Sequence, residues 1–129
     1  MSEAFVYVGT TAIKTGMVEE ARTRLAELVE FVETNEPRMI AFHAFLDEEA
    51  TRLTIVQVHP DTASMEFHLQ VNAKHFATSF GYLEATISEQ YYGSMSEHLA
   101  SELAKWDDPG VPVTRMAVHE GGFTRTSVR

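Results

Sequence analysis

Cysteine is absent from this chain of 129 residues. Its absence excludes disulfide bonds, thiolate metal sites and cysteine nucleophiles, and it fits a reducing compartment. Long hydrophobic runs are also absent, because no segment approaches the roughly 18 apolar residues that span a membrane. The opening segment MSEAFVYVG lacks the basic and apolar regions of a secretory signal. We therefore expect a cytoplasmic protein that does not bind a membrane.

Basic residues are scarce: 10 Lys and Arg stand against 19 Asp and Glu, so the formal net charge is −9. Such a balance repels phosphate backbones, which argues against a nucleic-acid partner. The hydrophobic fraction of 44% and the charged fraction of 22% are those of a globular protein. A chain of this length can bury a core as one domain without disulfides or structural metals.

Hydrophobic periodicity predicts an alternation of strands and helices. Between Val18 and Val32, apolar residues recur at three- and four-residue steps, which predicts an amphipathic helix that ends before Pro37. β-Branched and aromatic runs predict strands, and Ser94 with Glu97 predicts a capping box at the start of the last helix. The expected strands span residues 5–13, 39–46, 53–59, 83–93 and 111–119, and the later helices span about 62–79 and 94–106.

The expected strand at 39–46 is apolar on both faces. One face carries Met39, Ala41, His43 and Phe45, and the other carries Ile40, Phe42, Ala44 and Leu46. An antiparallel sheet normally leaves one face in water, and three helices on so short a chain can cover only one face. We therefore expect a second subunit to cover the other, which predicts a homodimer formed through the sheet face.

The segment at residues 36–76, EPRMIAFHAFLDEEATRLTIVQVHPDTASMEFHLQVNAKHF, resembles the antibiotic biosynthesis monooxygenase-like family of the dimeric α/β-barrel superfamily. The matching positions are Pro37, Asp47, His68, His75 and Phe76. The resemblance extends over about residues 5–92. Within one domain at 1–129, it makes residues 94–119 a helix–strand extension and residues 120–129 a polar tail.

The resemblance implies an α+β fold, in which a ferredoxin-like antiparallel sheet carries helices on one face and pairs with another subunit as a dimeric α/β barrel. It also implies oxygenation of a small aromatic or quinol-type substrate, without metal or flavin, in a cavity between sheet and helices. The alternative is a non-catalytic domain that binds a small ligand or only itself. Polar side chains that converge in a cavity favour the enzyme, whereas a cavity filled by Phe42, Phe45 and Phe67 favours the alternative.

Three polar residues of the second expected helix, His68, Asn72 and His75, are candidates for a site. At about 100° per residue they fall within about 60° of one another, along the border of the apolar stripe. This position suits the rim of a cavity, and it equally suits histidines that only bond a neighbouring backbone group. The two histidines are separated along the helix axis by about 10.5 Å, too far to share one ion through bonds of about 2 Å. We expect no bound metal and no cofactor.

His43 and His59 lie on paired strands, and a one-residue slip in register decides whether they share a face. If His43 faces the cavity beside Tyr7 and Phe45, it suits a general base, because histidine titrates near neutral pH. The alternative is a buried neutral histidine with a satisfied N–H group.

The sequence thus predicts two sets of site residues. The expected catalytic residues are His43, His68 and Asn72. The expected pocket residues are Tyr7, Phe45, His59, His75 and Tyr91. Tyr91 and its neighbour Tyr92 cannot both face the pocket, since adjacent strand residues point to opposite faces.

Overall fold

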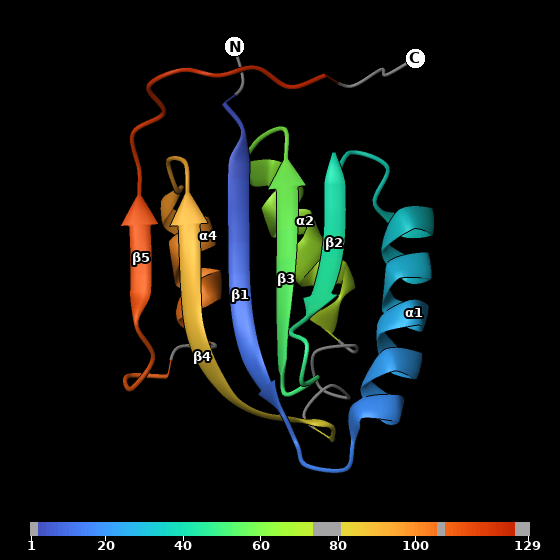
Figure 1. Cartoon of the computed structure of the whole chain (residues 1–129). Helices are drawn as coiled ribbons and strands as arrows, with labels where there is room; N and C mark the ends of the chain where they lie inside the picture. Colours follow the sequence, from blue (N-terminus) through green and yellow to red (C-terminus); the bar gives the residue numbers. More distant parts are fainter. Residues whose placement is uncertain (1–2, 74–80, 106–107, 126–129) are drawn as a thin grey trace.

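A five-stranded sheet flanked by helices forms the protein, as the computed structural model shows (Figure 1). The structure describes residues 3–73, 81–105 and 108–125. The elements in chain order are β1 (Phe5–Ile13), α1 (Val18–Asn35), β2 (Ala41–Leu46), β3 (Arg52–His59), α2 (Thr62–Val71), β4 (Leu83–Tyr92), α4 (Glu97–Ala104) and β5 (Val113–Met116). No helix in these ranges combines the length and hydropathy needed to cross a membrane.

The strand order is β2-β3-β1-β4-β5, and the first four strands pair antiparallel. This arrangement confirms the expected α+β, ferredoxin-like fold. The sheet is not wholly antiparallel, however, because β5 runs parallel to β4. The chain reaches β5 through α4, a crossover connection of the kind that parallel strands require.

The helices contact one face of the sheet. Figure 1 shows α2 and α4 behind the strands and α1 beside β2. The face toward the helices carries alternate residues of β1, of which Phe5, Gly9 and Ile13 are buried. The core on this side forms two clusters. One contains Phe5, Met65, Tyr91, Leu99 and Leu103, and the other contains Ile13, Ala21, Leu25, Leu53 and Tyr82.

None of the described helices lies over the opposite face of the sheet, which is the face toward the viewer in Figure 1. Val8 of β1 is paired with Val56 of β3, and both point away from the helices. At the two edges of this face, Phe45 is 57% exposed and Met116 is 58% exposed. The sequence predicted apolar side chains on both faces of the sheet. In the single chain, the described helices cover only one of these faces.

Helix starts follow the usual capping chemistry, with one correction to the sequence-based expectation. Asp61 accepts a bond from the backbone N–H of Ser64 at the start of α2. At the start of α4, Ser96 accepts from the N–H of Leu99 at 3.0 Å. The predicted capping box at Ser94 is therefore wrong, because the chain turns into the helix two residues later.

Several boundaries also differ from expectation. β2 begins at Ala41 rather than at residue 39. β5 covers only Val113–Met116, because its partner strand β4 ends at Tyr92 and Gly93 then turns away at φ +119°. The far end of the second helix, expected to reach residue 79, lies outside the described residues.

Candidate functional site

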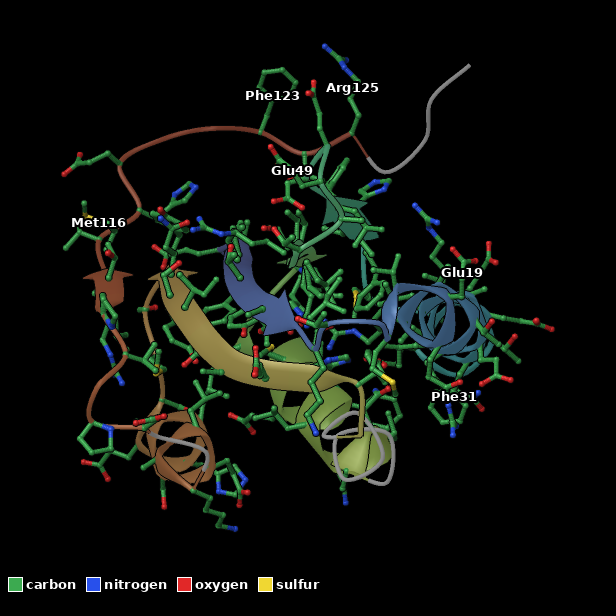
Figure 2. The ribbon with its side chains drawn as sticks, turned by 60° about the horizontal axis from the view of Figure 1, so that its bottom comes forward. Glu19, Phe31, Glu49, Met116, Phe123 and Arg125 are labelled. Atoms are coloured by element: carbon green, nitrogen blue, oxygen red, sulfur yellow. The ribbon has the colours of Figure 1, made fainter. Side chains whose placement is uncertain are left out.

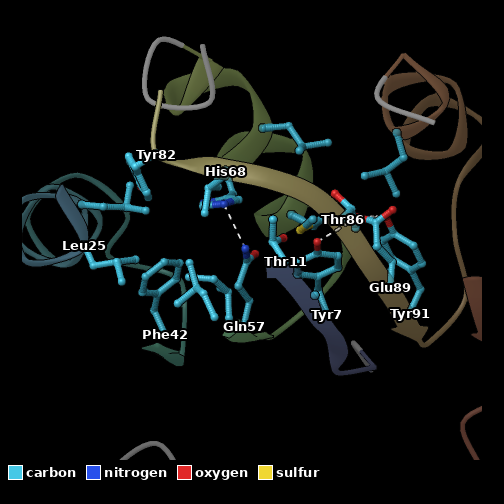
Figure 3. A pocket seen from close by; sticks show the side chains of 18 residues that line it. Tyr7, Thr11, Leu25, Phe42, Gln57, His68, Tyr82, Thr86, Glu89 and Tyr91 are labelled. Carbon is cyan, nitrogen blue, oxygen red and sulfur yellow. Dashed lines mark hydrogen bonds between the residues drawn. The ribbon is translucent and has the colours of Figure 1, made fainter. Parts of the chain in front are cut away.

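A cavity of about 240 Å³ lies between the sheet and the helices (Figure 3). Alternate side chains of β1, β3 and β4 form its floor, and α1, α2 and α4 contribute the opposite wall. Its polar lining residues are Tyr7, Thr11, Gln57, His68, Thr86, Glu89 and Tyr91. The apolar residues around them come from both core clusters, so the cavity interrupts the core.

One polar group of the cavity is centred on His68 of α2, which is 1% exposed. Its Nδ1 lies 2.8 Å from Oε2 of Glu36, the residue that follows α1. Glu36 adopts φ −127° and ψ 71°, outside the helical region, as expected for a residue that precedes a proline. Because α1 ends just before Pro37, the Glu36 carboxylate lies behind the histidine ring, where Glu36 is 4% exposed.

A chain of buried hydrogen bonds continues from His68 through the sheet. Nε2 of His68 lies 3.1 Å from the amide nitrogen of Gln57, and Oε1 of Gln57 lies 2.9 Å from Nε2 of His59. Nδ1 of His59 then contacts the hydroxyl of Ser64 at 2.8 Å. Figure 3 shows the first of these bonds, in which side chains from α2 and β3 meet.

The orientation of the Gln57 side chain in this series of hydrogen bonds determines the tautomers of His59 and His68. The Gln57 amide donates to Nε2 of His68, so the proton of His68 sits on Nδ1 and is donated to Glu36. The carbonyl of Gln57 accepts from Nε2–H of His59, which leaves Nδ1 of His59 to accept from Ser64. In this arrangement Nε2 of His68 is the acceptor of the Gln57 amide, and the side-chain nitrogen of Asn72 also lies 3.1 Å from Nδ1 of His68.

His59 itself is not suited to act as a base near neutral pH. Burial, and to a lesser extent the neighbouring His68, lower its pKa to about 3. The ring is 0% exposed and is absent from the residues that line the cavity. The expected place of His59 in the pocket is therefore wrong: it lies one layer behind, where it supports Gln57.

Asn72 also lies behind the cavity rather than in it. It is 0% exposed and directs its amide nitrogen to Oε2 of Glu36 and, at 3.0 Å, to the backbone carbonyl of His68. Within the described residues its carbonyl oxygen is buried without a hydrogen-bond partner. The helical arithmetic placed His68 and Asn72 at the border of the buried face. Both are fully buried, because the end of α1 covers them.

The second polar group of the cavity consists of Tyr7, Glu89 and Tyr91. The Tyr7 hydroxyl donates to Oε2 of Glu89 at 2.9 Å, and the Tyr91 hydroxyl donates to the same oxygen at 3.3 Å. Two hydroxyl donors thus share one carboxylate oxygen. The pKa of Tyr7 lies well above its usual range, first because of burial and then because of the Glu89 charge. Tyr7 is therefore a phenol that donates rather than a base.

The space for Tyr7 is provided by Gly9, two residues along β1. A methyl group placed on Gly9 would lie 2.1 Å from the hydroxyl oxygen of Tyr7. The tyrosine thus lies flat along the strand, with its hydroxyl where another residue would carry its Cβ. This close approach explains a glycine in the middle of a central strand.

Two expected site residues lie on the other face of the sheet. The register pairs Phe42 with Gln57 and His43 with Val56. Phe42 therefore faces the cavity, while His43 and Phe45 point away from the helices and are exposed. The expectations for His43 as a cavity base and for Phe45 as a pocket residue are wrong, because the hairpin register puts them on the same face as Val56. His75 lies outside the described residues.

The cavity does contain His68, Tyr7 and Tyr91, as expected. Sequence reasoning missed Glu36, Gln57 and Glu89. A signal existed for Glu89, which precedes Tyr91 by two residues and so shares its strand face. For Glu36 the only local signal is the proline after it, and its partner is 32 positions away.

Metal ligands do not gather in the described ranges: no group of three His, Asp or Glu side chains there is arranged to hold an ion.

No family model and no curated protein matches this sequence. Solved structures do resemble it. MupZ from Pseudomonas fluorescens superposes with a TM-score of 0.72 at 16% identity, over 99% of each chain. A protein from Caulobacter crescentus CB15, provisionally named an antibiotic biosynthesis monooxygenase, gives 0.62 at 14% identity over 70% of this chain and 88% of its own.

A similarly named protein from Bacteroides thetaiotaomicron VPI-5482 gives a TM-score of 0.59 at 20% identity and covers 65% of this chain and 83% of its own. These two proteins thus match about two thirds of the chain, whereas MupZ matches nearly all of it. The resemblance seen in the sequence is confirmed at the level of the fold: this chain has the architecture of the antibiotic biosynthesis monooxygenase-like proteins.

Proposed function

We propose that the protein is a cofactor-independent monooxygenase that oxidises a small quinol-type aromatic in the cavity. The observation that carries the proposal is the position of His68. It lines the cavity, its Nε2 lies 3.1 Å from the side-chain amide nitrogen of Gln57, and Glu36 lies 2.8 Å from its other ring nitrogen. A carboxylate behind a histidine stabilises the imidazolium that forms when the ring takes a proton.

In the proposed reaction, Nε2 of His68 removes a hydroxyl proton from the substrate in place of its contact with Gln57. The electron-rich quinolate then reduces dioxygen, the second substrate, and a C–O bond forms at a ring carbon. Cleavage of the O–O bond releases water, so that a hydroquinone and O₂ give a hydroxyquinone and H₂O. The substrate supplies all four electrons, and the reaction needs no other reductant.

The arrangement of the phenylalanines also supports an enzyme over the non-catalytic alternative. Of the three residues that would fill the cavity, Phe45 and Phe67 are 57% and 44% exposed, and Phe42 alone is among its lining residues. Polar side chains from four elements, β1, β3, α2 and β4, meet around the space that remains.

The test is oxygen uptake with a panel of hydroquinones and naphthohydroquinones, corrected for the rate without protein. We expect His68→Gln to lower kcat by about 10²- to 10⁴-fold, the usual contribution of a general base. His98→Gln on the exposed side of α4 is the matched control and should leave kcat unchanged. Uptake that equals the protein-free rate with every compound, despite measurable ligand binding, would favour the non-catalytic ligand-binding alternative.

We also propose that the open face of the sheet pairs with a second copy of the chain. The supporting observation is the pair of Val8 and Val56 at the centre of this face, together with the exposed Phe45 at its edge. A second copy presents the same residues, so that each chain covers the other.

Light scattering at tens of micromolar should accordingly give the mass of a dimer. Val8→Arg places an unpaired charge at the centre of this face and should give a monomer, whereas Thr23→Arg on the exposed side of α1 should remain a dimer. A wild-type mass of 14.5 kDa at that concentration would rule out this dimer.

A further inference from the structure

The Tyr7–Glu89–Tyr91 group is separate from the His68 group, and the proposed reaction does not use it. Figure 3 shows Gln57 and His68 in the middle of the cavity and Glu89 with the two tyrosines to their right. All five residues line the same cavity. A ligand that reaches both groups therefore meets one polar group at each end of the cavity.

Glu89 has acceptor capacity left for a ligand. Both tyrosine hydroxyls bond Oε2, and in the described part of the chain no group is bonded to Oε1. The Tyr7 hydroxyl lies over Gly9, in space that the Cβ of any other residue would fill. Glu89 thus has one carboxylate oxygen held by two tyrosine hydroxyls and a second oxygen that faces no donor among the described residues, and a ligand hydroxyl matches such an acceptor.

The charge of the cavity adds a second condition. Glu89 lines it and Glu36 lies directly behind His68. No lysine or arginine is among the described lining residues. An anionic ligand would be buried beside a like charge without a counter-ion, and both effects oppose binding.

We infer that the cavity selects an uncharged ligand with two hydroxyl groups, one held by His68 and the other by Oε1 of Glu89, and that it discriminates against carboxylates. This inference rests on the proposed function for the role of His68. It adds the chemical class of the substrate: a neutral aromatic diol with hydroxyl groups at opposite ends, rather than a monophenol or an aromatic acid.

The experiment compares three compounds of one shape by calorimetric or fluorescence titration at pH 7: 2,6-dihydroxynaphthalene, 2-naphthol and 6-hydroxy-2-naphthoate. We expect the diol to bind wild-type protein at least 5-fold more tightly than 2-naphthol and at least 10-fold more tightly than the hydroxynaphthoate. In Glu89→Gln the preference for the diol over the hydroxynaphthoate should fall at least 5-fold, because the charge is lost while the amide carbonyl can still accept.

Glu84→Gln is the matched control, since it removes the same charge from an exposed position of the same strand, and it should leave all three affinities unchanged. The inference is overturned if wild-type protein binds the hydroxynaphthoate as tightly as the diol, or binds none of the three at 1 mM. The ratios between the wild-type affinities for the three compounds test the inference even if Glu89→Gln does not fold. Because these are binding measurements, a correct preference without oxygen uptake would reject the proposed oxidation alone.

Discussion

Tyr7 and Gly9 show how one missing side chain shapes the site. The Tyr7 ring lies over the position that a Cβ at residue 9 would occupy. Backbone atoms of a central strand cannot shift to relieve a contact of 2.1 Å, so the ring must move instead.

We expect Gly9→Ala to displace Tyr7 from Glu89 and to lower the free energy of unfolding by about 1–3 kcal/mol, the usual cost of overpacking. Urea denaturation measures the loss. Gly110→Ala, at a position where the nearest atom lies 3.6 Å from the added methyl, is the control. A normal stability of Gly9→Ala, with unchanged ligand binding, would contradict this account of Tyr7.

The buried neutral histidine at position 59 makes stability depend on pH. Its pKa is about 3 in the folded chain and about 6.5 in an unfolded one. Between these values the unfolded chain binds the extra proton, so the free energy of unfolding is highest above pH 6.5 and falls as the pH drops toward 3. A shift of this size corresponds to a loss on the order of 4 kcal/mol.

Urea denaturation between pH 7 and pH 4 checks this expectation. His59→Gln keeps a polar group near Ser64 and Gln57 but cannot take the proton. Its stability should therefore fall less steeply with acid than that of wild type. Equal slopes for the two proteins would show that His59 is not the titrating group.

At the scale of elements, the short helix α4 depends on its cap. Ser96 accepts from the N–H of Leu99 and donates to Oε1 of Glu66 at 2.8 Å, which also links α4 to α2. We expect Ser96→Ala to lower the free energy of unfolding by about 1 kcal/mol. Ser94→Ala is the matched control and should change it by less than about 0.5 kcal/mol, since Ser94 reaches only the exposed Glu3. Thermal or urea unfolding of the two variants distinguishes them.

The elements were the part of the structure that the sequence predicted best. The period-2 runs and the 3.6-residue repeat are local signals, and they correctly placed β1, α1, β3 and β4. Register is not local. Whether His43 or Phe42 faces the cavity depends on how β2 aligns with β3, and a shift by one residue reverses the answer. Both faces of β2 were apolar, so the pattern contained no information on this choice.

The site was predicted only in part, because several of its contacts join residues far apart in the sequence. His68 stood out because histidine is rare on an apolar helix face, and Tyr91 because of its strand. Glu36 and Glu89 did not, since isolated glutamates in a chain with 19 acidic residues are usually solvated. Their role depends on contacts with residues 32 and 82 positions away, which no window of sequence reveals.

At the scale of the whole molecule, the cavity separates the two clusters of the core. One cluster includes Phe5 and Leu99, the other Ile13 and Leu25, and residues of both line the empty space between them. Protein interiors are otherwise packed as densely as organic crystals. A gap of about 240 Å³ in so small a protein therefore has a mechanical consequence.

Hydrostatic pressure favours the state of smaller volume, and unfolding eliminates internal voids. We expect the volume of this protein to shrink on unfolding within the usual range, about 20–100 mL/mol, with a contribution from the incompletely packed walls of the cavity. High-pressure NMR or tyrosine fluorescence measures it. Leu25→Trp, which adds bulk to the wall of the cavity, should reduce the change; a larger change in that variant would contradict the expectation. A bound ligand should also reduce the volume change on unfolding. The pressure at which half the molecules unfold therefore reports occupancy of the cavity without any turnover.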